Sequence, residues 1–148
     1  LKGLIKHHSI NPIDFLSVTH DLQDFNKLVL PENNLKKTLS KIQGRKIIYT
    51  NAPKTYTNKI LKISKIFELF DEIFTIEDSN FIPKPDQGMM DTFLKKYNIS
   101  EGFFIDDVKE NLFTAKNSGL TTIWITNEEN QPSYIDKKIE KISDLLSL

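Results

Sequence analysis

The sequence predicts an α/β fold with a parallel, Rossmann-like sheet. Four short runs rich in β-branched and aromatic residues are typical of buried strands: residues 45–51, 72–76, 102–106 and 121–126. Apolar residues at helical spacing lie between these runs, so strands and helices alternate along the chain. Such alternation predicts parallel strands joined by right-handed crossovers.

Helical patterns surround the first of these strands. A short helix is expected after Asn11, with Asn11 as its N-cap and Pro12 in its first turn. A second helix of about three turns is expected over residues 31–42, because Gly44 follows it where a C-cap glycine belongs. A third is expected over residues 55–66, where apolar side chains share one helical face.

The second half of the chain repeats the alternation. Helices are expected over residues 86–97 and 108–118, and Gly119 closes the second of them. Residues 133–148 alternate Ile and Leu with charged residues, and we expect them to form a terminal helix.

Composition excludes several classes of function. The 148 residues carry 20 basic and 20 acidic side chains, and this zero net charge argues against a nucleic acid polymer as the main partner. The absence of Cys excludes disulfides, thiolate metal sites and Cys nucleophiles, and makes the cytoplasm the default compartment. No run approaches the roughly 18 apolar residues of a membrane span, so no membrane partner is expected.

Polar residues stand where the expected strands end, which is where parallel α/β sheets bind ligands. Thr50 and Asn51 end the first strand, and Asp106 and Asp107 end the third. Adjacent carboxylates repel each other, and a hard cation such as Mg²⁺ would relieve that repulsion through oxygen ligands. Lys84, between two prolines, offers a positioned cation for a phosphate.

Each of these signals also has a plain structural interpretation. Asp106 and Asp107 could simply cap the following helix, and Lys84 could be an ordinary solvated lysine. Thr50 and Asn51 could serve turn chemistry before Pro53. Asn111, one turn into the helix, could brace the acid pair or be an ordinary surface residue.

The order of these motifs resembles the haloacid dehalogenase-like hydrolase superfamily. Within it, the segments GRKIIYTNAPKTYTNKIL, LFDEIFTIED, PKP and FFIDDVKENLFTAKNSGLTTIWI resemble the pyrimidine 5′-nucleotidase group. The resemblance implies that Thr50 and Asn51 bind the phosphoryl group and that Lys84 stabilises its charge. It also implies that Asp107 ligates Mg²⁺ directly, that Asp106 does so through water, and that Asn111 supports them.

One family motif has no counterpart here. The Asp-x-Asp motif that supplies the nucleophile and the general acid is missing, and Asp21 and Asp24 follow helical sequence rather than an apolar strand. We therefore expect a carboxy-terminal fragment that lacks the first, central strand of the sheet. Residues 1–26 resemble the later part of the family's small helical cap, and residues 27–148 resemble its α/β core.

The resemblance implies a Mg²⁺-dependent phosphomonoester hydrolase that acts through an aspartyl-phosphate intermediate. Its substrate would be a small phosphorylated metabolite, with a nucleoside monophosphate favoured, and the fragment itself would be inactive. Two alternatives stay open: a non-catalytic binding module with the same scaffold, and a phosphomutase. The sequence does not specify an oligomeric state.

Overall fold

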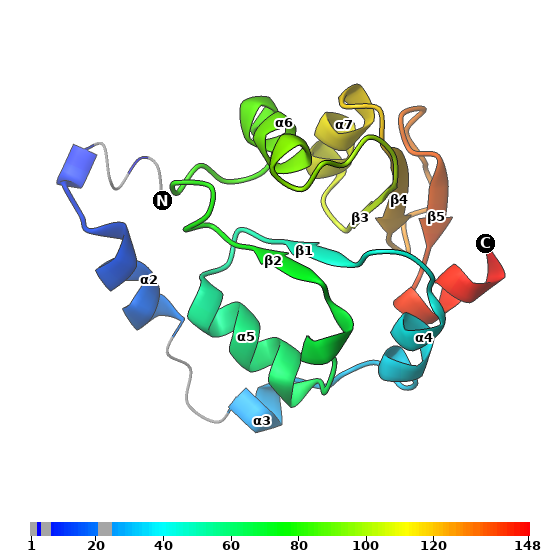
Figure 1. The fold of residues 1–148 in the computed structure, drawn as a ribbon, viewed down its shortest axis with the longest axis horizontal. Helices are drawn as coiled ribbons and strands as arrows, with labels where there is room; N and C mark the ends of the chain where they lie inside the picture. Colours follow the sequence, from blue (N-terminus) through cyan, green and yellow to red (C-terminus); the bar gives the residue numbers. More distant parts are fainter. Residues whose placement is uncertain (1–2, 4–6, 21–24) are drawn as a thin grey trace. The chain divides into compact units, whose positions relative to one another are not determined.

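The computed structural model describes residue 3, residues 7–20 and residues 25–148 (Figure 1). The contacts divide the chain into two compact units, Leu1–Pro83 and Lys84–Leu148, and each unit is described by itself. The expected border between a cap remnant and a core, after residue 26, stays a prediction. Among the described residues, no helix combines the length and the apolar character needed to cross a bilayer.

The first unit contains a pair of parallel strands and several helices. β1 (Ile47–Tyr49) and β2 (Glu72–Phe74) pair in register, with Ile48 beside Ile73. Phe74 is completely buried, as expected for a strand covered on both faces. The helical segments of this unit are α2 (Pro12–Thr19), α3 (Phe25–Leu28), α4 (Leu35–Lys41), α5 (Lys54–Ile63) and the 3-10 helix η1 (Phe67–Leu69).

Local chemistry explains where these helices begin. The Asn11 side chain accepts a hydrogen bond from the Ile13 N–H at 2.9 Å, so α2 starts as the sequence predicts. α4 is shorter than the expected helix over residues 31–42. Asn34 adopts φ +66°, a left-handed conformation that cannot belong to the helix, so α4 begins only at Leu35.

A distant carboxylate caps α5. Pro53, at the N-cap, has no side chain that could accept a hydrogen bond, and both oxygens of Glu77 accept instead from the Lys54 N–H at 3.0 and 3.1 Å. Glu77 lies in the loop after β2 and Lys54 follows the loop after β1. The contact therefore ties together the two loops at the carboxyl ends of the paired strands.

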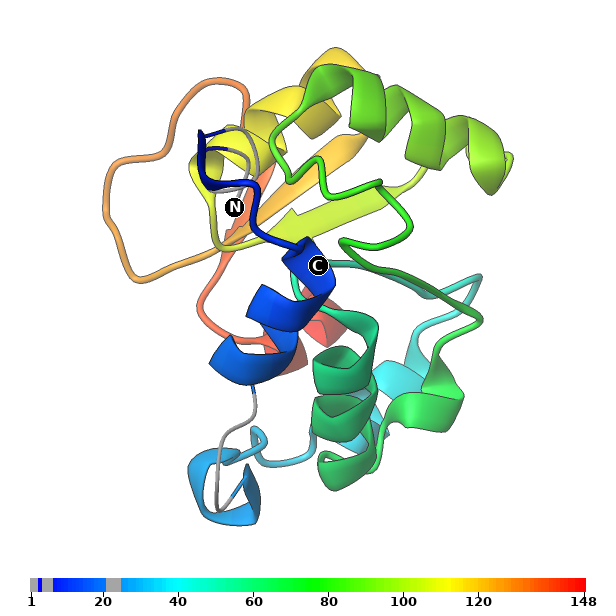
Figure 2. The same ribbon diagram turned by 90° about the vertical axis from the view of Figure 1, so that its left-hand side faces the viewer.

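The second unit is a three-stranded parallel sheet in the order β3-β4-β5. Figures 1 and 2 place two of its helices, α6 and α7, on the same side of β3 and β4, and α7 packs directly on both strands. Leu112 and Ala115 of α7 are completely buried in this layer. The elements are α6 (Gln87–Lys96), β3 (Phe103–Asp106), α7 (Lys109–Asn117), β4 (Thr121–Ile125), β5 (Lys137–Ile139) and the 3-10 helix η2 (Ile142–Ser147).

The predicted fold class and all four predicted strands are confirmed, but the prediction for the tail is wrong. Residues 137–139 form β5, which pairs parallel with β4, and only the 3-10 helix η2 follows. The edge of β4 offers unpaired backbone groups, and β5 satisfies them: the Thr126 N–H donates to the Ile139 carbonyl at 2.9 Å. Ile139 is buried, while Lys138 is exposed, so the alternation in this segment has the period of a strand.

Asp136 joins three parts of the second unit. Its carboxylate accepts from the Lys116 ammonium at 2.6 and 2.8 Å and from the backbone N–H of buried Thr122 at 2.8 Å. The hydrogen bond from Lys116 and then that from the Thr122 N–H lower the pKa of Asp136 from 3.8 to about 2. The carboxylate thus links α7, β4 and the segment before β5.

Replacing Asp136 should destabilise the second unit in a pH-dependent way. Because the pKa is depressed in the folded state, the stabilisation is present above pH 3.8 and is lost as the pH falls toward about 2. D136N should cost about 1–2 kcal/mol at neutral pH, since a charged acceptor is lost. Thermal unfolding of wild type and D136N from neutral to acid pH tests this, with E101Q as an exposed control. A difference that does not shrink in acid would contradict it.

Candidate active site

Asp106, the last residue of β3, is the centre of a buried polar cluster. One carboxylate oxygen accepts from the Lys84 ammonium at 2.6 Å. The other accepts from the Val108 N–H at 2.9 Å and from the Asn111 side-chain amide at 3.0 Å. The side chains of Lys84 and Asp106 are only 10% and 6% exposed, so the pair is largely removed from water.

Each member of the cluster comes from a different local structure. The apolar run of β3 stops before Asp106, its last residue, and the chain then turns into α7. The N-cap of α7, Val108, has no capping side chain, and the Asp106 carboxylate takes the Val108 N–H in its place. Asn111 follows on the first turn of α7 and is buried at 5% exposure. Sequence-predicted residues Lys84, Asp106 and Asn111 are therefore brought together.

Asp107 has a different environment from its neighbour. Asp107 is an exposed residue, and its backbone carbonyl accepts a hydrogen bond from the indole N–H of Trp124 at 3.0 Å. One aspartate of the pair is thus held inside by three donors, and the other is an exposed residue. This arrangement leaves Asp107 accessible to a ligand.

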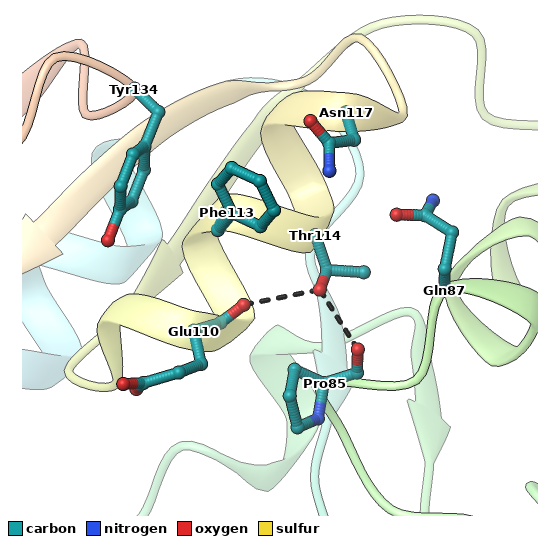
Figure 3. A pocket seen from close by; sticks show the side chains of 7 residues that line it. All are labelled: Pro85, Gln87, Glu110, Phe113, Thr114, Asn117 and Tyr134. Carbon is teal, nitrogen blue, oxygen red and sulfur yellow. Dashed lines mark hydrogen bonds between the residues drawn. The ribbon is translucent and has the colours of Figure 1, made fainter.

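The segment that carries Lys84 is fixed to α7. The Thr114 hydroxyl, on a residue 5% exposed, bonds to the Pro85 carbonyl at 2.9 Å and to the Glu110 carbonyl at 3.2 Å (Figure 3). The Lys84 ammonium also lies 5.5 Å from the centroid of the Phe104 ring. Lys84 is therefore positioned by its backbone neighbour as well as by its ion pair.

An open pocket of about 640 Å³ lies on the outer side of this segment. Figure 3 shows its walls, which include Pro85, Phe113 and Tyr134, and the rings of Phe113 and Tyr134 meet edge to face at 5.2 Å. None of the residues that the sequence predicts for the site lines this pocket. It borders the Lys84 segment at Pro85.

Thr50 and Asn51 belong to the first unit, directly after β1. The Thr50 N–H donates to the Phe74 carbonyl at 2.9 Å, and the Thr50 hydroxyl oxygen accepts from the Ala52 N–H at 3.0 Å. A hydroxyl that accepts one hydrogen bond keeps its own hydrogen for donation. Thr50 is half-buried and Asn51 is exposed. The Thr50 hydroxyl therefore stabilises the turn as an acceptor and offers a hydrogen-bond donor at the strand end.

The donor set at the end of β3 suits a hard cation. Asp106 and Asp107 offer carboxylate oxygens, and Mg²⁺ commonly takes one or two carboxylates and completes its shell with water and phosphate oxygens. Because Asp106 already accepts three hydrogen bonds, Asp107 is the carboxylate suited to direct contact. Within the described part of the chain, no three acidic or His side chains cluster as a complete metal site.

Two residues of this region, Thr114 and Trp124, were not predicted from the sequence. Thr114 looks like an ordinary helical residue, and its bond to Pro85 joins positions 29 apart in the chain. The position of Trp124 follows from the register of β4, which sets Trp124 beside Asp106. The predicted strand starts, residues 102 and 121, are one residue out of step with the observed pairing of Phe103 with Thr121, so they do not identify this neighbour.

Comparison with known sequences identifies a family and curated relatives. A family model described as haloacid dehalogenase-like hydrolase matches residues 4–125. The chain is also 28% identical over 139 residues to phosphate metabolism protein 8 of Saccharomyces cerevisiae, an alignment that covers 81% of this chain and 42% of the yeast protein. The chain thus spans less than half the length of this curated relative.

Solved structures share the fold. A HAD phosphatase from Thermococcus onnurineus superposes with a TM-score of 0.70 at 21% identity, covering 92% of this chain and 69% of that one. The HAD-hydrolase YfnB from Bacillus subtilis, described as bound to magnesium, gives a TM-score of 0.69 at 23% identity, covering 78% of this chain and 54% of that one. At these identities the likeness concerns the fold.

Removing the Lys84 ammonium should strongly destabilise the second unit. K84M leaves the buried Asp106 carboxylate without its cation, which should cost about 3 kcal/mol or more. K116M breaks an ion pair of the same length, but that pair is 39% and 32% exposed, so it should cost about 1 kcal/mol or less. Urea unfolding followed by the fluorescence of Trp124, the single Trp of the chain, measures both.

The double variant K84M/D106N provides the control for this comparison. Its cost should be smaller than the sum of the two single costs, because each single change strands the other partner. Equal losses of unfolding free energy in K84M and K116M would contradict this prediction. So would a loss in the double variant equal to the sum of the losses in K84M and D106N, because it would show no coupling between Lys84 and Asp106.

Proposed function

The chain belongs to the haloacid dehalogenase-like hydrolase family, whose model matches residues 4–125, and we propose that it forms the metal- and phosphate-binding part of a phosphomonoester hydrolase. The observation that carries this proposal is the buried Lys84–Asp106 pair with exposed Asp107 beside it at the end of β3. A cation and paired carboxylates at a strand end suit phosphoryl transfer, which depends on positioning and charge neutralisation.

Each proposed role follows from the chemistry of its side chain. Asp107 would hold Mg²⁺ directly, and Asp106 would contribute through water, because the Asp106 oxygens already accept three hydrogen bonds. When bound, Mg²⁺ supplies charge stabilisation for the phosphoryl oxygens. Asn111 keeps the Asp106 carboxylate oriented through its bond at 3.0 Å.

The phosphate-binding roles fall to Lys84, Thr50 and Asn51. The Lys84 ammonium neutralises phosphoryl charge, and its fixed backbone limits the entropy lost on binding. Thr50 donates its hydroxyl hydrogen to a phosphoryl oxygen, and Asn51 offers a further donor beside it. The same groups would serve a phosphomutase, and only the acceptor of the phosphate would differ.

In this proposal the nucleophile is not one of the residues named above. We infer that an Asp-x-Asp motif on a strand preceding Leu1 supplies the nucleophilic aspartate and the general acid, and that the chain is a carboxy-terminal part of the enzyme. The 42% coverage of the yeast relative accords with this inference. The proposed substrate is a pyrimidine 5′-nucleotide or a similar small phosphate ester, and the proposed compartment is the cytoplasm.

Activity should depend on Asp107 and on the upstream segment. The gene product that contains this chain should release inorganic phosphate from p-nitrophenyl phosphate with Mg²⁺, and D107N should lower kcat by about 100-fold or more, since several kcal/mol of charge stabilisation depend on the metal. E101Q, before the other end of β3, is the matched control. The 148 residues alone should be inactive. Activity of this chain alone would contradict the missing nucleophile, and full activity of D107N would contradict the metal assignment.

The substrate class can be tested with matched esters. Pyrimidine 5′-monophosphates should give a kcat/KM about tenfold or more above that of purine 5′-monophosphates or hexose phosphates, a difference that a shaped pocket can supply. Phosphate analysis of the products separates the reaction types, because a hydrolase releases phosphate and a mutase returns it to the sugar. No release from any ester, despite bound Mg²⁺, would favour the non-catalytic binding module.

A further inference from the structure

Trp124 makes an unusual contact for a core residue. It is 1% exposed in the middle strand of the second unit, and the parallel register sets it beside Asp106. Its indole N–H, which needs an acceptor when buried, donates to the Asp107 carbonyl at 3.0 Å. The partner is therefore the backbone of the exposed aspartate, Asp107.

A second contact holds the other end of the same turn. The Lys109 ammonium, from the first residue of α7, lies 4.9 Å from the centroid of the Trp124 ring. Glu128 accepts from this ammonium at 2.9 Å, and that hydrogen bond raises the pKa of Lys109. One indole thus contacts the peptide group of Asp107 and, two residues later, the charged end of Lys109.

These contacts restrict how Asp107 presents its side chain. The Asp107 carbonyl lies in the peptide plane that joins Asp107 to Val108, so holding the carbonyl restricts the ψ angle of Asp107 and with it the orientation of the side chain relative to that plane. A carboxylate that binds a metal must be held close to its productive geometry, and supporting hydrogen bonds normally do this. The buried Trp124 ring has little access to a ligand itself, so any influence must pass through the turn.

We propose that Trp124 is a positioning residue that fixes the Asp107 carboxylate for Mg²⁺ binding. This inference rests on the proposed function, because it assumes that Asp107 is the direct ligand. The two parts of the Trp124 side chain have different roles in this proposal. The ring fills the core, and the indole N–H sets the orientation of Asp107. A Trp124 that served only the core would affect stability and leave metal affinity unchanged.

Two variants of Trp124 separate these roles. W124F removes the N–H together with part of the ring, while benzothienylalanine at position 124 keeps the bicyclic shape and removes only the N–H. I123V trims a neighbouring buried residue of β4 and serves as the control for lost packing. The gene product that contains this chain is used throughout, and urea unfolding reports the stability of each variant.

The test reads Mg²⁺ affinity rather than activity. Titration with MgCl₂, followed by the NMR amide shifts of Asp107, Val108 and Lys109, gives a dissociation constant for each variant. Both Trp124 variants should bind Mg²⁺ about tenfold or more weakly than wild type, as is typical when a supporting hydrogen bond of a metal ligand is lost. I123V should lose stability and keep the wild-type affinity.

The outcomes distinguish this inference from the proposed function. Wild-type affinity in both Trp124 variants, with Mg²⁺ bound by wild type and not by D107N, would overturn the role of Trp124 and leave the metal assignment intact. Absence of Mg²⁺ binding in wild type would overturn both. Weakened binding in the benzothienylalanine variant at unchanged stability would assign the effect to the N–H itself.

Discussion

The buried ion pair between Lys84 and Asp106 is the constraint on which the second unit depends. Removing two charges from water costs several kcal/mol for each ion. A buried pair is tolerated only when its remaining donors and acceptors also form hydrogen bonds. Here the Val108 N–H and the Asn111 amide satisfy the second oxygen of Asp106. Four groups from three segments must therefore be in place together: the loop before α6, the end of β3 and the first turn of α7.

The same constraint explains why two adjacent aspartates differ so much. Asp106 is enclosed by donors, which leaves its neighbour as the carboxylate open to solvent. The Thr114 hydroxyl and the Trp124 indole act one layer further out, on the backbones of Pro85 and Asp107. Side chains on α7 and β4 thus hold the main chain at Pro85, beside Lys84, and at Asp107.

The fold was largely predictable because its signals are local. β-Branched runs marked β1 to β4, Asn11 marked the start of α2, and Gly119, at φ +86°, marked the end of α7. The tail was not predictable in this way, since the three residues Lys-Lys-Ile of β5 fit a strand as well as part of a helix. Pairing with β4 decided the outcome, and pairing is a property of the whole sheet.

The grouping of three candidate residues was also predictable. The motif after β3 indicated Asp106 and Asn111, the two flanking prolines indicated Lys84, and the structure brings these three residues together. Trp124 and Thr114 were missed because their roles depend on strand register and helix packing, which no short motif encodes. The functions assigned to Thr50 and Asn51 stay predictions that rest on family resemblance and on the free hydroxyl hydrogen of Thr50.

β5 has a consequence for how the molecule behaves at high concentration. It is the outermost strand of its sheet, only three residues long, and two of them, Lys137 and Lys138, are lysines. A short, positively charged edge is a poor template for the strand of another molecule, because docking would bring like charges together and offer few backbone partners. At this border of the sheet, β5 therefore guards against self-association and amyloid-like growth.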